Sequence, residues 1–273
     1  MTDTTIAFIG SGNMASSIIG GLINNGWPAD NIIATGRTQE KLDVLRQQLG
    51  VTITLNNREA VAAADIVILG VKPQGMEALL SDLSPSLDSS RHLIISVAAG
   101  ISMVSLEQWV GSEFSIVRSM PNTPALVQCG ATGLYANKHT SESQKQLTNT
   151  IFNAIGISEW VPSEDLIDAV IAVSGSSPAY YFLFMESIIK AGIELGLDAK
   201  TSERLALQTA LGAARMAVDS DTDVAELRRR VTSPNGTTEQ AIQSFQRDGL
   251  EEGVSKAMSA AVNRAREMSK ELA

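Results

Sequence analysis

The chain has 273 residues, which is enough for one large domain or two ordinary ones, and 44% of them are hydrophobic, enough to form a core. The net charge of -9 and the lack of any basic cluster larger than Arg228-Arg229-Arg230 argue against a nucleic-acid or anionic-membrane partner. The lone cysteine, Cys129, excludes an intrachain disulfide and a cysteine-based metal site. The N-terminus lacks the features of a signal peptide, and no stretch reaches the roughly 18 apolar residues of a membrane span. We therefore predict a cytoplasmic protein.

Short apolar runs alternate with helical stretches through about residue 160. Runs that are apolar on both faces predict buried parallel strands, and the stretches between them predict helices that cover the sheet. The predicted strands are 6–9, 31–35, 65–71, 92–97 and 114–120, and helices are predicted over 14–25 and 39–49. The N-terminal part is therefore predicted to be an α/β domain of Rossmann type with a parallel sheet.

The pattern changes at Val161-Pro162, after which we predict no strand. The stretch Ser174-Gly175-Ser176-Ser177-Pro178 is predicted to break the chain, with Pro178 in the first turn of the next helix. The predicted helices are 165–173, 179–196, 201–219, 223–230, 238–247 and 250–270. We divide the chain into an α/β domain, 1–162, and an all-α domain, 163–273.

The predicted helix 179–196 is apolar nearly all round, interrupted only by Glu186, Lys190 and Glu194. Such a helix should be buried on most of its surface. A domain of about 110 residues has limited interior to bury several helices of this kind. We therefore predict a homodimer that is formed through the helical domain.

A glycine pattern, Gly10-x-Gly12-x-x-Ala15, follows the first predicted strand and opens the first predicted helix. Gly10 permits a tight turn, Gly12 allows the backbone to approach a pyrophosphate, and Ala15 keeps the helix close to the strand. The N-terminus of the helix then presents free N–H groups to the phosphates. We predict that Gly10-Ser11-Gly12-Asn13-Met14-Ala15 binds a nicotinamide dinucleotide, although an ordinary strand-to-helix turn can have the same pattern.

The second predicted strand ends in Thr35-Gly36-Arg37-Thr38, without the acidic residue that binds the ribose 2′-OH in NAD-preferring sites. Thr35 and Thr38 offer hydroxyl groups, and Arg37 offers a planar cation suited to a phosphate. This turn favours NADPH, with NADH as a weaker cofactor. The alternative is that Arg37 is a solvated side chain at a turn.

Two further loops follow predicted strands, Val71-Lys72-Pro73 and Ala98-Ala99-Gly100. Ligands bind at the carboxyl ends of strands in open parallel sheets, and the small residues of the second loop would let a nicotinamide-ribose lie against backbone. Plain turns would have the same spacing. The two histidines, His92 and His139, belong to no motif, and we predict that neither is catalytic.

Three other stretches of the chain are polar and rich in accessible backbone groups, namely 118–125, 174–180 and 231–238. The last of them leads into a predicted helix, whose first N–H groups would bind a carboxylate. Thr237 and Thr238 add hydroxyl groups. The pattern alone favours a well-capped helix over a binding site.

At these residues the sequence resembles the pyrroline-5-carboxylate reductase family almost from end to end. The resemblance covers Phe8–Ala15, Val71–Gln74, Ser96–Gly100, Met120–Ala125 and Ser174–Tyr180, and it is most specific at Val231–Thr238. It implies reduction of the cyclic imine 1-pyrroline-5-carboxylate to L-proline, the last step of proline biosynthesis, with NADPH as the hydride donor. It also implies an intertwined dimer, often assembled further into a ring of dimers.

The resemblance implies roles for particular residues. The substrate carboxylate would lie on N–H groups around Gly236, Thr237 and Thr238, and Thr238 would be the catalytic residue, hydrogen-bonded to the ring nitrogen as the proton donor or as part of a relay from water. The predicted substrate-binding residues are Val231, Ser233, Pro234, Asn235, Gly236, Thr237, Thr238 and Asn122. The predicted cofactor-binding residues are Gly10, Ser11, Gly12, Asn13, Met14, Ala15, Thr35, Gly36, Arg37, Thr38, Asn57, Val71, Lys72, Pro73, Ala98 and Ala99.

One departure from the family pattern is visible, because Asn235 occupies the first glycine of the usual Ser-Pro-Gly-Gly. Asparagine tolerates the left-handed backbone conformation better than most residues, so we expect the loop to keep its shape. Two other functions are considered. A β-hydroxyacid or 6-phosphogluconate-type dehydrogenase needs a lysine where this chain has Ser176-Ser177-Pro178, and a catalytically silent NADPH-binding protein would bind NADPH without turnover.

Overall fold

The computed structural model describes residues 3–271 and divides the chain into two compact units. The sheet unit comprises the residues up to Ser176 together with those from Ala261 onward, and the helical unit comprises Ser177–Ala260. Contacts therefore place the boundary later than the predicted division at residue 162. The segment after residue 162 stays with the sheet because the helix that follows it packs on a strand, where a Cβ at Gly133 would lie 2.5 Å from a methyl group of Val170.

The described residues of the sheet unit form one eight-stranded sheet in the order β3-β2-β1-β4-β5-β6-β7-β8. All neighbouring strands are parallel except β6 and β7, which are antiparallel. The strands are β1 (Ile6–Ile9), β2 (Ile32–Thr35), β3 (Thr52–Thr54), β4 (Ile66–Leu69), β5 (Leu93–Ser96), β6 (Ser115–Met120), β7 (Gly130–Ala136) and β8 (Gly156–Trp160). This is a Rossmann-type arrangement, in which β1 lies inside the sheet and the later strands are added on both sides of it.

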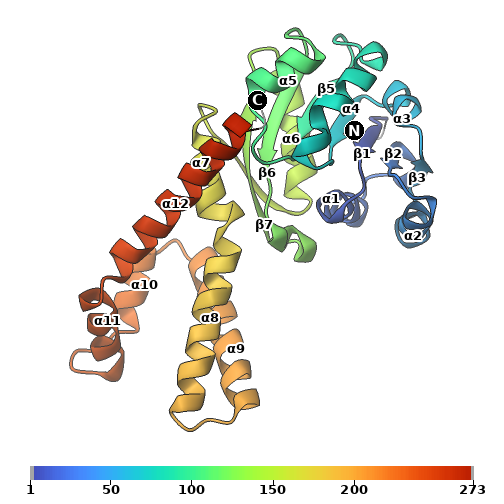
Figure 1. Ribbon diagram of the computed structural model, residues 1–273. Coiled ribbons are helices and arrows are strands. Elements are labelled where there is room, and N and C mark those ends of the chain that lie inside the picture. The colour runs from blue at the N-terminus through green and yellow to red at the C-terminus, as the bar shows by residue number, and fades with distance from the viewer. Residues whose placement is uncertain (1–2, 272–273) are drawn as a thin grey trace. The chain divides into compact units, whose positions relative to one another are not determined.

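Helices cover both faces of this sheet (Figure 1). Side chains of β1 alternate between two cores, with Ile6 and Phe8 in one and Ala7 and Ile9 in the other. Helices α1 and α6 supply the first core, and α3, α4 and α5 supply the second. The helices of this unit are α1 (Asn13–Asn24), α2 (Gln39–Leu49), α3 (Asn57–Ala63), α4 (Met76–Leu83), α5 (Met103–Val110), α6 (Glu142–Asn153) and α7 (Leu166–Val170). The predicted strands are apolar on both faces because both faces are covered.

Three strands were not predicted, and the expectation of an all-parallel sheet is corrected at β7. Strand β3 has only three residues, and β8 shows a half-exposed, alternating pattern rather than an apolar run. Strand β7 reads Gly-Ala-Thr-Gly-Leu-Tyr-Ala and lacks the valine and isoleucine residues typical of a buried strand. Its antiparallel direction follows from the short connection after β6, which leaves no room for a crossover helix.

The helical unit contains α8 (Ser177–Glu194), α9 (Ala199–Val218), α10 (Val224–Arg230), α11 (Thr237–Arg247) and the first half of α12 (Leu250–Glu271). Among the described residues no strand follows Trp160, as predicted. Helices α8 and α9 approach closely, because a Cβ at Gly192 would lie 2.3 Å from the Ser202 hydroxyl oxygen. That hydroxyl donates to the Ile189 carbonyl at 2.8 Å.

The predicted chain break at Ser174–Pro178 is confirmed only in part: Ser176 is a bend and α8 begins at Ser177 with Pro178 in its first turn, as predicted, but no loop precedes it. Residues Ile171–Gly175 form a π-helical turn that joins α7 to α8, so that Leu166–Glu194 is one helical run. In the π turn the Ser176 N–H donates to the Ile171 carbonyl at 2.7 Å, and the extra residue lets small polar residues continue the helix. By length and composition alone this run could cross a membrane, although core helices of soluble proteins pass the same test.

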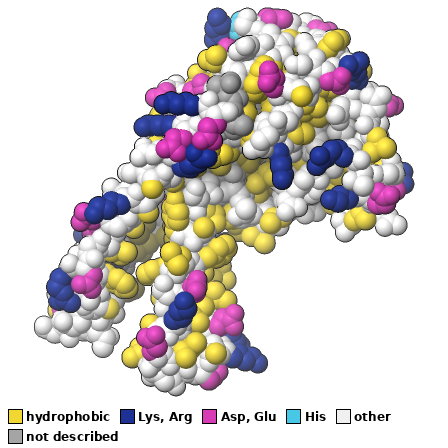
Figure 2. Space-filling model, in the orientation of Figure 1, with side chains coloured by type: hydrophobic (Ala, Val, Ile, Leu, Met, Phe, Trp, Pro, Cys, Tyr) yellow, Lys and Arg dark blue, Asp and Glu magenta, His cyan; other side chains and the backbone are white. Residues whose placement is uncertain are grey.

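Helix α8 has no buried side chain, although the sequence predicted that a helix so apolar would be buried on most of its surface. Apolar side chains gather over α8 and α9 in Figure 2, and the exposed ones include Tyr181, Phe182, Leu183, Leu207 and Leu211. An exposed apolar surface of this kind marks a site of association.

His92 provides a pH-dependent contribution to stability. Its ring is buried, the Nδ1 atom accepts from the Asp88 N–H at 2.8 Å, and the Nε2 atom therefore donates to the Val61 carbonyl at 3.1 Å. Burial lowers the pKa of this imidazole below its ordinary value. The folded protein resists protonation of His92, whereas the unfolded chain takes up the proton near its ordinary pKa of about 6.5.

The contribution of His92 is therefore complete above pH of about 6.5 and is lost as the pH falls below it, by at most about 1.4 kcal/mol per pH unit. Chemical denaturation of the wild type and of His92→Gln at pH 7.5 and 5.5 should show their stability difference shrinking at the lower pH. The exposed His139 supplies the matched variant, His139→Gln, for which we expect no such change. A pH-independent difference for His92→Gln would contradict the assignment.

Candidate functional site

The loops predicted to bind the cofactor lie at one edge of the sheet. Strands β2, β1, β4 and β5 are parallel neighbours, so the loops that follow them leave the sheet from the same side. The glycine loop follows β1, which lies between β2 and β4. This is the position at which the strand order reverses and dinucleotides bind in open α/β sheets.

The glycine loop has the geometry that a pyrophosphate requires. Gly10 has a φ of +94°, and a Cβ there would lie 3.0 Å from a Val71 methyl group and 3.1 Å from the Gly70 carbonyl carbon. A Cβ at Gly12 would meet nothing within 4 Å. Gly12 is the N-cap of α1, no side chain caps that helix, and its first turn has no acidic residue. The helix N-terminus therefore remains available for a phosphate, and these residues fit the pyrophosphate of a dinucleotide.

The turn after β2 approaches the same loop. A Cβ at Gly36 would lie 3.2 Å from the Ser11 hydroxyl oxygen. Thr35, however, is fully buried, and its hydroxyl oxygen accepts from the Gly10 N–H at 3.1 Å. The structure thus assigns to Thr35 the task of holding the glycine loop, where the sequence predicted direct contact with the cofactor.

Arg37 and Thr38 remain free to meet a ligand. Arg37 is exposed and forms no ion pair with any described residue, and Thr38 is the N-cap of α2 without a side-chain capping bond. A guanidinium group beside an uncapped helix N-terminus suits a phosphate dianion.

We predict that Arg37→Ala raises the KM for NADPH by roughly 10- to 100-fold, the loss of one charge-assisted hydrogen bond, and changes the KM for NADH far less. Steady-state kinetics with both cofactors would measure this. The matched control is Arg46→Ala, which removes an exposed arginine of α2 that pairs with Asp43 at 3.0 Å. Equal changes of the KM for NADPH and the KM for NADH in Arg37→Ala would contradict the assignment of Arg37 to a phosphate of NADPH.

The remaining cofactor candidates belong to three other segments. Val71 packs near Gly10, Lys72 is exposed before a 3-10 turn that begins at Pro73, and Asn57 is the first residue of α3. After β5, the Ala98 N–H donates to the Ser96 hydroxyl oxygen at 3.3 Å. Ala99 is half-buried in the same loop. Gly100 follows with a φ of +78°.

Asn122 serves as a tether in the sheet unit. Its side-chain nitrogen donates to the Ser174 carbonyl of the π turn at 3.0 Å, and its side-chain oxygen accepts from the Ala131 N–H at 2.9 Å. Asn122 is only 8% exposed. The structure therefore shows Asn122 holding the π turn, and its predicted contact with substrate stays a prediction.

The predicted substrate loop, Val231–Thr238, lies wholly in the helical unit. Helix α11 begins at Thr237, with Gly236 as N-cap and no side-chain capping bond. Asn235 has a φ of +59°, which confirms that this position uses the left-handed conformation for which glycine is usual. The predicted residues Val231, Ser233 and Pro234 complete the loop and are exposed.

Two details sharpen the chemistry at the start of α11. Glu239 accepts from the Asn235 N–H at 2.7 Å, so one N–H group of the loop is already satisfied by a carboxylate. The hydroxyl groups of Thr237 and Thr238 form no hydrogen bond with any described residue. The N-terminal turn of α11 thus offers free N–H and O–H groups to a small acidic ligand.

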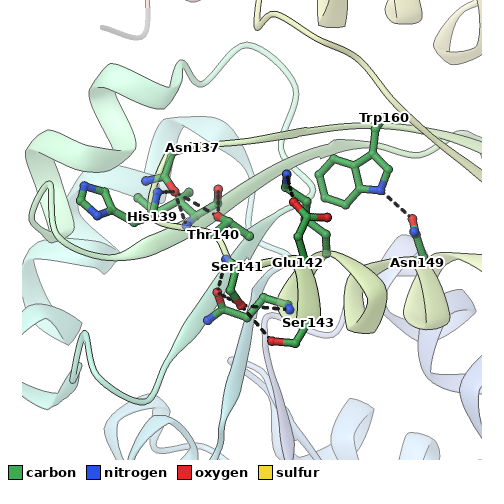
Figure 3. Close-up of polar contacts among 11 residues, drawn as sticks. Asn137, His139, Thr140, Ser141, Glu142, Ser143, Asn149 and Trp160 are labelled. Atoms are coloured by element: carbon green, nitrogen blue, oxygen red, sulfur yellow. Dashed lines mark hydrogen bonds and ion pairs between the residues drawn. The ribbon is translucent and has the colours of Figure 1, made fainter.

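Both histidines lie at the opposite edge of the sheet. His92 directly precedes β5, and His139 follows β7, whose end is tied to the beginning of β6 by the Asn137 N–H and the Ile116 carbonyl at 3.0 Å. Asn137 organises this turn, and the imidazole of His139 points away from its contacts (Figure 3). That neither histidine is catalytic stays a prediction.

Comparison with known proteins identifies relatives whose sequences match nearly the full length of this chain. Residues 164–268 match the family model described as pyrroline-5-carboxylate reductase dimerisation, and residues 5–100 match the one described as NADP oxidoreductase, coenzyme F420-dependent. A pyrroline-5-carboxylate reductase from Pseudomonas aeruginosa is 50% identical over 100% of this chain and 99% of its own. One from Vibrio alginolyticus is 42% identical over 99% of both chains.

Solved structures that resemble this chain carry the same name as these relatives. A pyrroline-5-carboxylate reductase from Coxiella burnetii is 46% identical and superposes with a TM-score of 0.95 over 97% of this chain and 98% of its own. The chain belongs to the pyrroline-5-carboxylate reductase family. A pyrroline carboxylate reductase from Plasmodium falciparum, solved with NADP bound, is 32% identical with a TM-score of 0.85 over 98% of this chain and 99% of its own. Membership in this family disfavours the β-hydroxyacid dehydrogenase alternative.

Proposed function

We propose that this chain reduces 1-pyrroline-5-carboxylate to L-proline with NADPH as the hydride donor, the last step of proline biosynthesis. Two helix N-termini without side-chain caps carry the assignment. One, at α1, follows the glycine loop and suits a pyrophosphate; the other, at α11, suits a small carboxylate. Relatives with this name extend over the full length of the chain.

The chemistry explains why no strong acid-base pair is needed. When bound, NADPH would supply a hydride to the imine carbon, and the ring nitrogen would end with the proton that makes the secondary amine. A protonated imine is already electrophilic, so holding it in the correct orientation supplies much of the rate enhancement. We assign the substrate carboxylate to the N–H groups around Gly236–Thr238, and the ring nitrogen to the Thr238 hydroxyl as donor or relay.

We further propose that the chain acts as a homodimer through its helical unit, with a ring of dimers as the higher assembly, and in the cytoplasm. The exposed apolar residues of α8 and α9 support the dimer, as does the dimerisation model that matches 164–268. A second chain over this surface would bury the helix that was predicted to be buried.

One assay tests the reaction. Purified protein should oxidise NADPH when 1-pyrroline-5-carboxylate is added, with L-proline as the product, and should not do so with a panel of β-hydroxyacids and their oxo acids. NADPH binding without turnover of any substrate would favour the silent NADPH-binding protein. Turnover of an oxo acid at a comparable rate would favour the dehydrogenase alternative.

A further inference from the structure

The loop between β5 and α5 is held at both ends by side chains from outside it. At its start, the buried Ser119 hydroxyl donates to the Ser96 carbonyl at 2.8 Å. At its end, the Glu164 carboxylate accepts from the Met103 N–H at 2.5 Å. The same carboxylate oxygen accepts from the Arg118 guanidinium, so one oxygen joins a helix N-terminus to a strand.

Glu164 acts as a second cap for α5. The helix has its own N-cap, Ser102, whose hydroxyl oxygen accepts from the Ser105 N–H at 3.0 Å. That bond leaves the Met103 N–H, the first of the helix, without a local partner. Glu164 supplies the partner from 61 residues away, and a negative charge at a helix N-terminus is favourable.

Arg118 holds the carboxylate in place. Its side chain is only 8% exposed, whereas that of Glu164 is 26% exposed, so the guanidinium is the more deeply buried partner. Arg118 lies opposite Ser96 in the register of β5 and β6. The ion pair is therefore level with the point where the chain leaves β5 and enters the loop.

We propose that Arg118 and Glu164 form a clamp that positions the loop 97–102 for the nicotinamide half of NADPH, without touching the cofactor themselves. This inference rests on the proposed function, because Ala98 and Ala99 in this loop are assigned to that half. The adenosine half is assigned to the glycine loop and to Arg37, which follow other strands. A loop that binds a ligand precisely must be held in place by hydrogen bonds from neighbouring residues. The clamp supplies one such bond, from the Met103 N–H to Glu164, where the loop enters α5.

Removing a positioning ion pair should change the affinity for the ligand, whereas removing a purely structural ion pair should change only the stability of the fold. Replacing both members of a buried ion pair with apolar residues of similar size is often neutral for stability, whereas removing one leaves a buried charge without a partner. The double variant Arg118→Met/Glu164→Leu therefore removes the clamp and leaves no orphaned charge. Its loop loses the bond to Met103 while the sheet keeps its packing.

The experiment measures the binding of two probes by the full-length protein. The double variant should bind NADPH about tenfold more weakly than the wild type, the loss of roughly one hydrogen bond to a charged group. It should bind 2′,5′-ADP, which lacks the nicotinamide half, with unchanged affinity. Hydrogen exchange without ligand should be faster at the Met103 amide and unchanged in β1. The matched control is Asp165→Asn, an exposed carboxylate next to Glu164 that forms no capping bond, for which no change is expected.

The possible outcomes distinguish failure of the clamp from failure of the proposed reaction. Unchanged NADPH affinity in a folded double variant, or equal weakening of NADPH and 2′,5′-ADP, would overturn the clamp. Should the double variant fail to fold, Glu164→Met removes the acceptor of the Met103 N–H and keeps a side chain of similar length, and the same selective loss of NADPH affinity is required of it. A wild-type protein that binds NADPH but does not reduce 1-pyrroline-5-carboxylate would end the proposed reaction, and both binding measurements would still test the clamp.

Discussion

Gly12→Val is expected to abolish useful NADPH binding and to leave the fold intact. Gly12 has φ -76° and ψ -176°, an extended conformation that a β-branched residue adopts readily, and a Cβ there would meet nothing within 4 Å. The valine side chain would instead fill the space through which a pyrophosphate reaches the N-terminus of α1. We expect the Kd for NADPH to rise by about 100-fold or more, or roughly 3 kcal/mol of binding free energy.

The measurement is NADPH titration together with thermal unfolding. The matched control is Gly20→Ala on the same helix, where the nearest atom to a new Cβ is 4.0 Å away. This variant should gain about 0.5 to 1 kcal/mol of stability, because alanine is the better helix former, and should bind NADPH normally. Normal NADPH affinity in Gly12→Val would mean that the dinucleotide does not approach this loop.

Thr238→Ala is expected to lower the turnover number by about 100-fold or more, the range of a lost acid-base group. Thr238 is the second residue of α11, its hydroxyl forms no hydrogen bond with any described residue, and alanine is a good helix former. Stability should therefore be unchanged, and so should the Kd for NADPH. Steady-state kinetics with 1-pyrroline-5-carboxylate, together with NADPH titration and thermal unfolding, would test all three expectations.

Two further variants make this test specific. Thr238→Ser keeps the hydroxyl and should recover most of the lost turnover. Thr232→Ala removes a nearby hydroxyl that is already bonded to the Arg228 carbonyl at 2.7 Å, and it should have little effect on turnover. An undiminished turnover number in Thr238→Ala would refute the catalytic role of this residue.

The predicted cofactor loop and the predicted substrate loop each lead into a helix whose N-cap is glycine. Gly12 and Gly236 place no side chain over the first turn, so neither helix is capped by its own N-cap residue. Elsewhere, α3, α5, α6, α9 and α10 begin with a side-chain cap. Helices α2, α4 and α7 also begin without a side-chain capping bond, and the N-cap of α4 is likewise a glycine, Gly75, so the missing cap supports the assignment of α1 and α11 only together with the loops that precede them.

Much of this architecture is readable in the residues themselves. The predicted strands at 6–9, 65–71 and 92–97 contain the unbroken apolar runs 6–9, 66–69 and 93–95 because both faces of a central parallel strand are buried, and the structure confirms β1, β4 and β5 there. The glycine pattern and the positive φ of Asn235 were also predictable, since they depend on local backbone sterics. The partly exposed strands β3 and β8 and the glycine-containing β7 have no such signature.

Local pattern thus determined five of the eight strands, most of the helices, the glycine loop and the family resemblance. Only the tertiary structure decided what several polar side chains do. Thr35 bonds to Gly10, Asn122 bonds to the π turn, and Glu164 bonds to Met103, across separations of 25, 52 and 61 residues. The physical reason is that a buried polar group must find a partner, and which partner lies within reach is set by strand order and register, which no local spacing encodes.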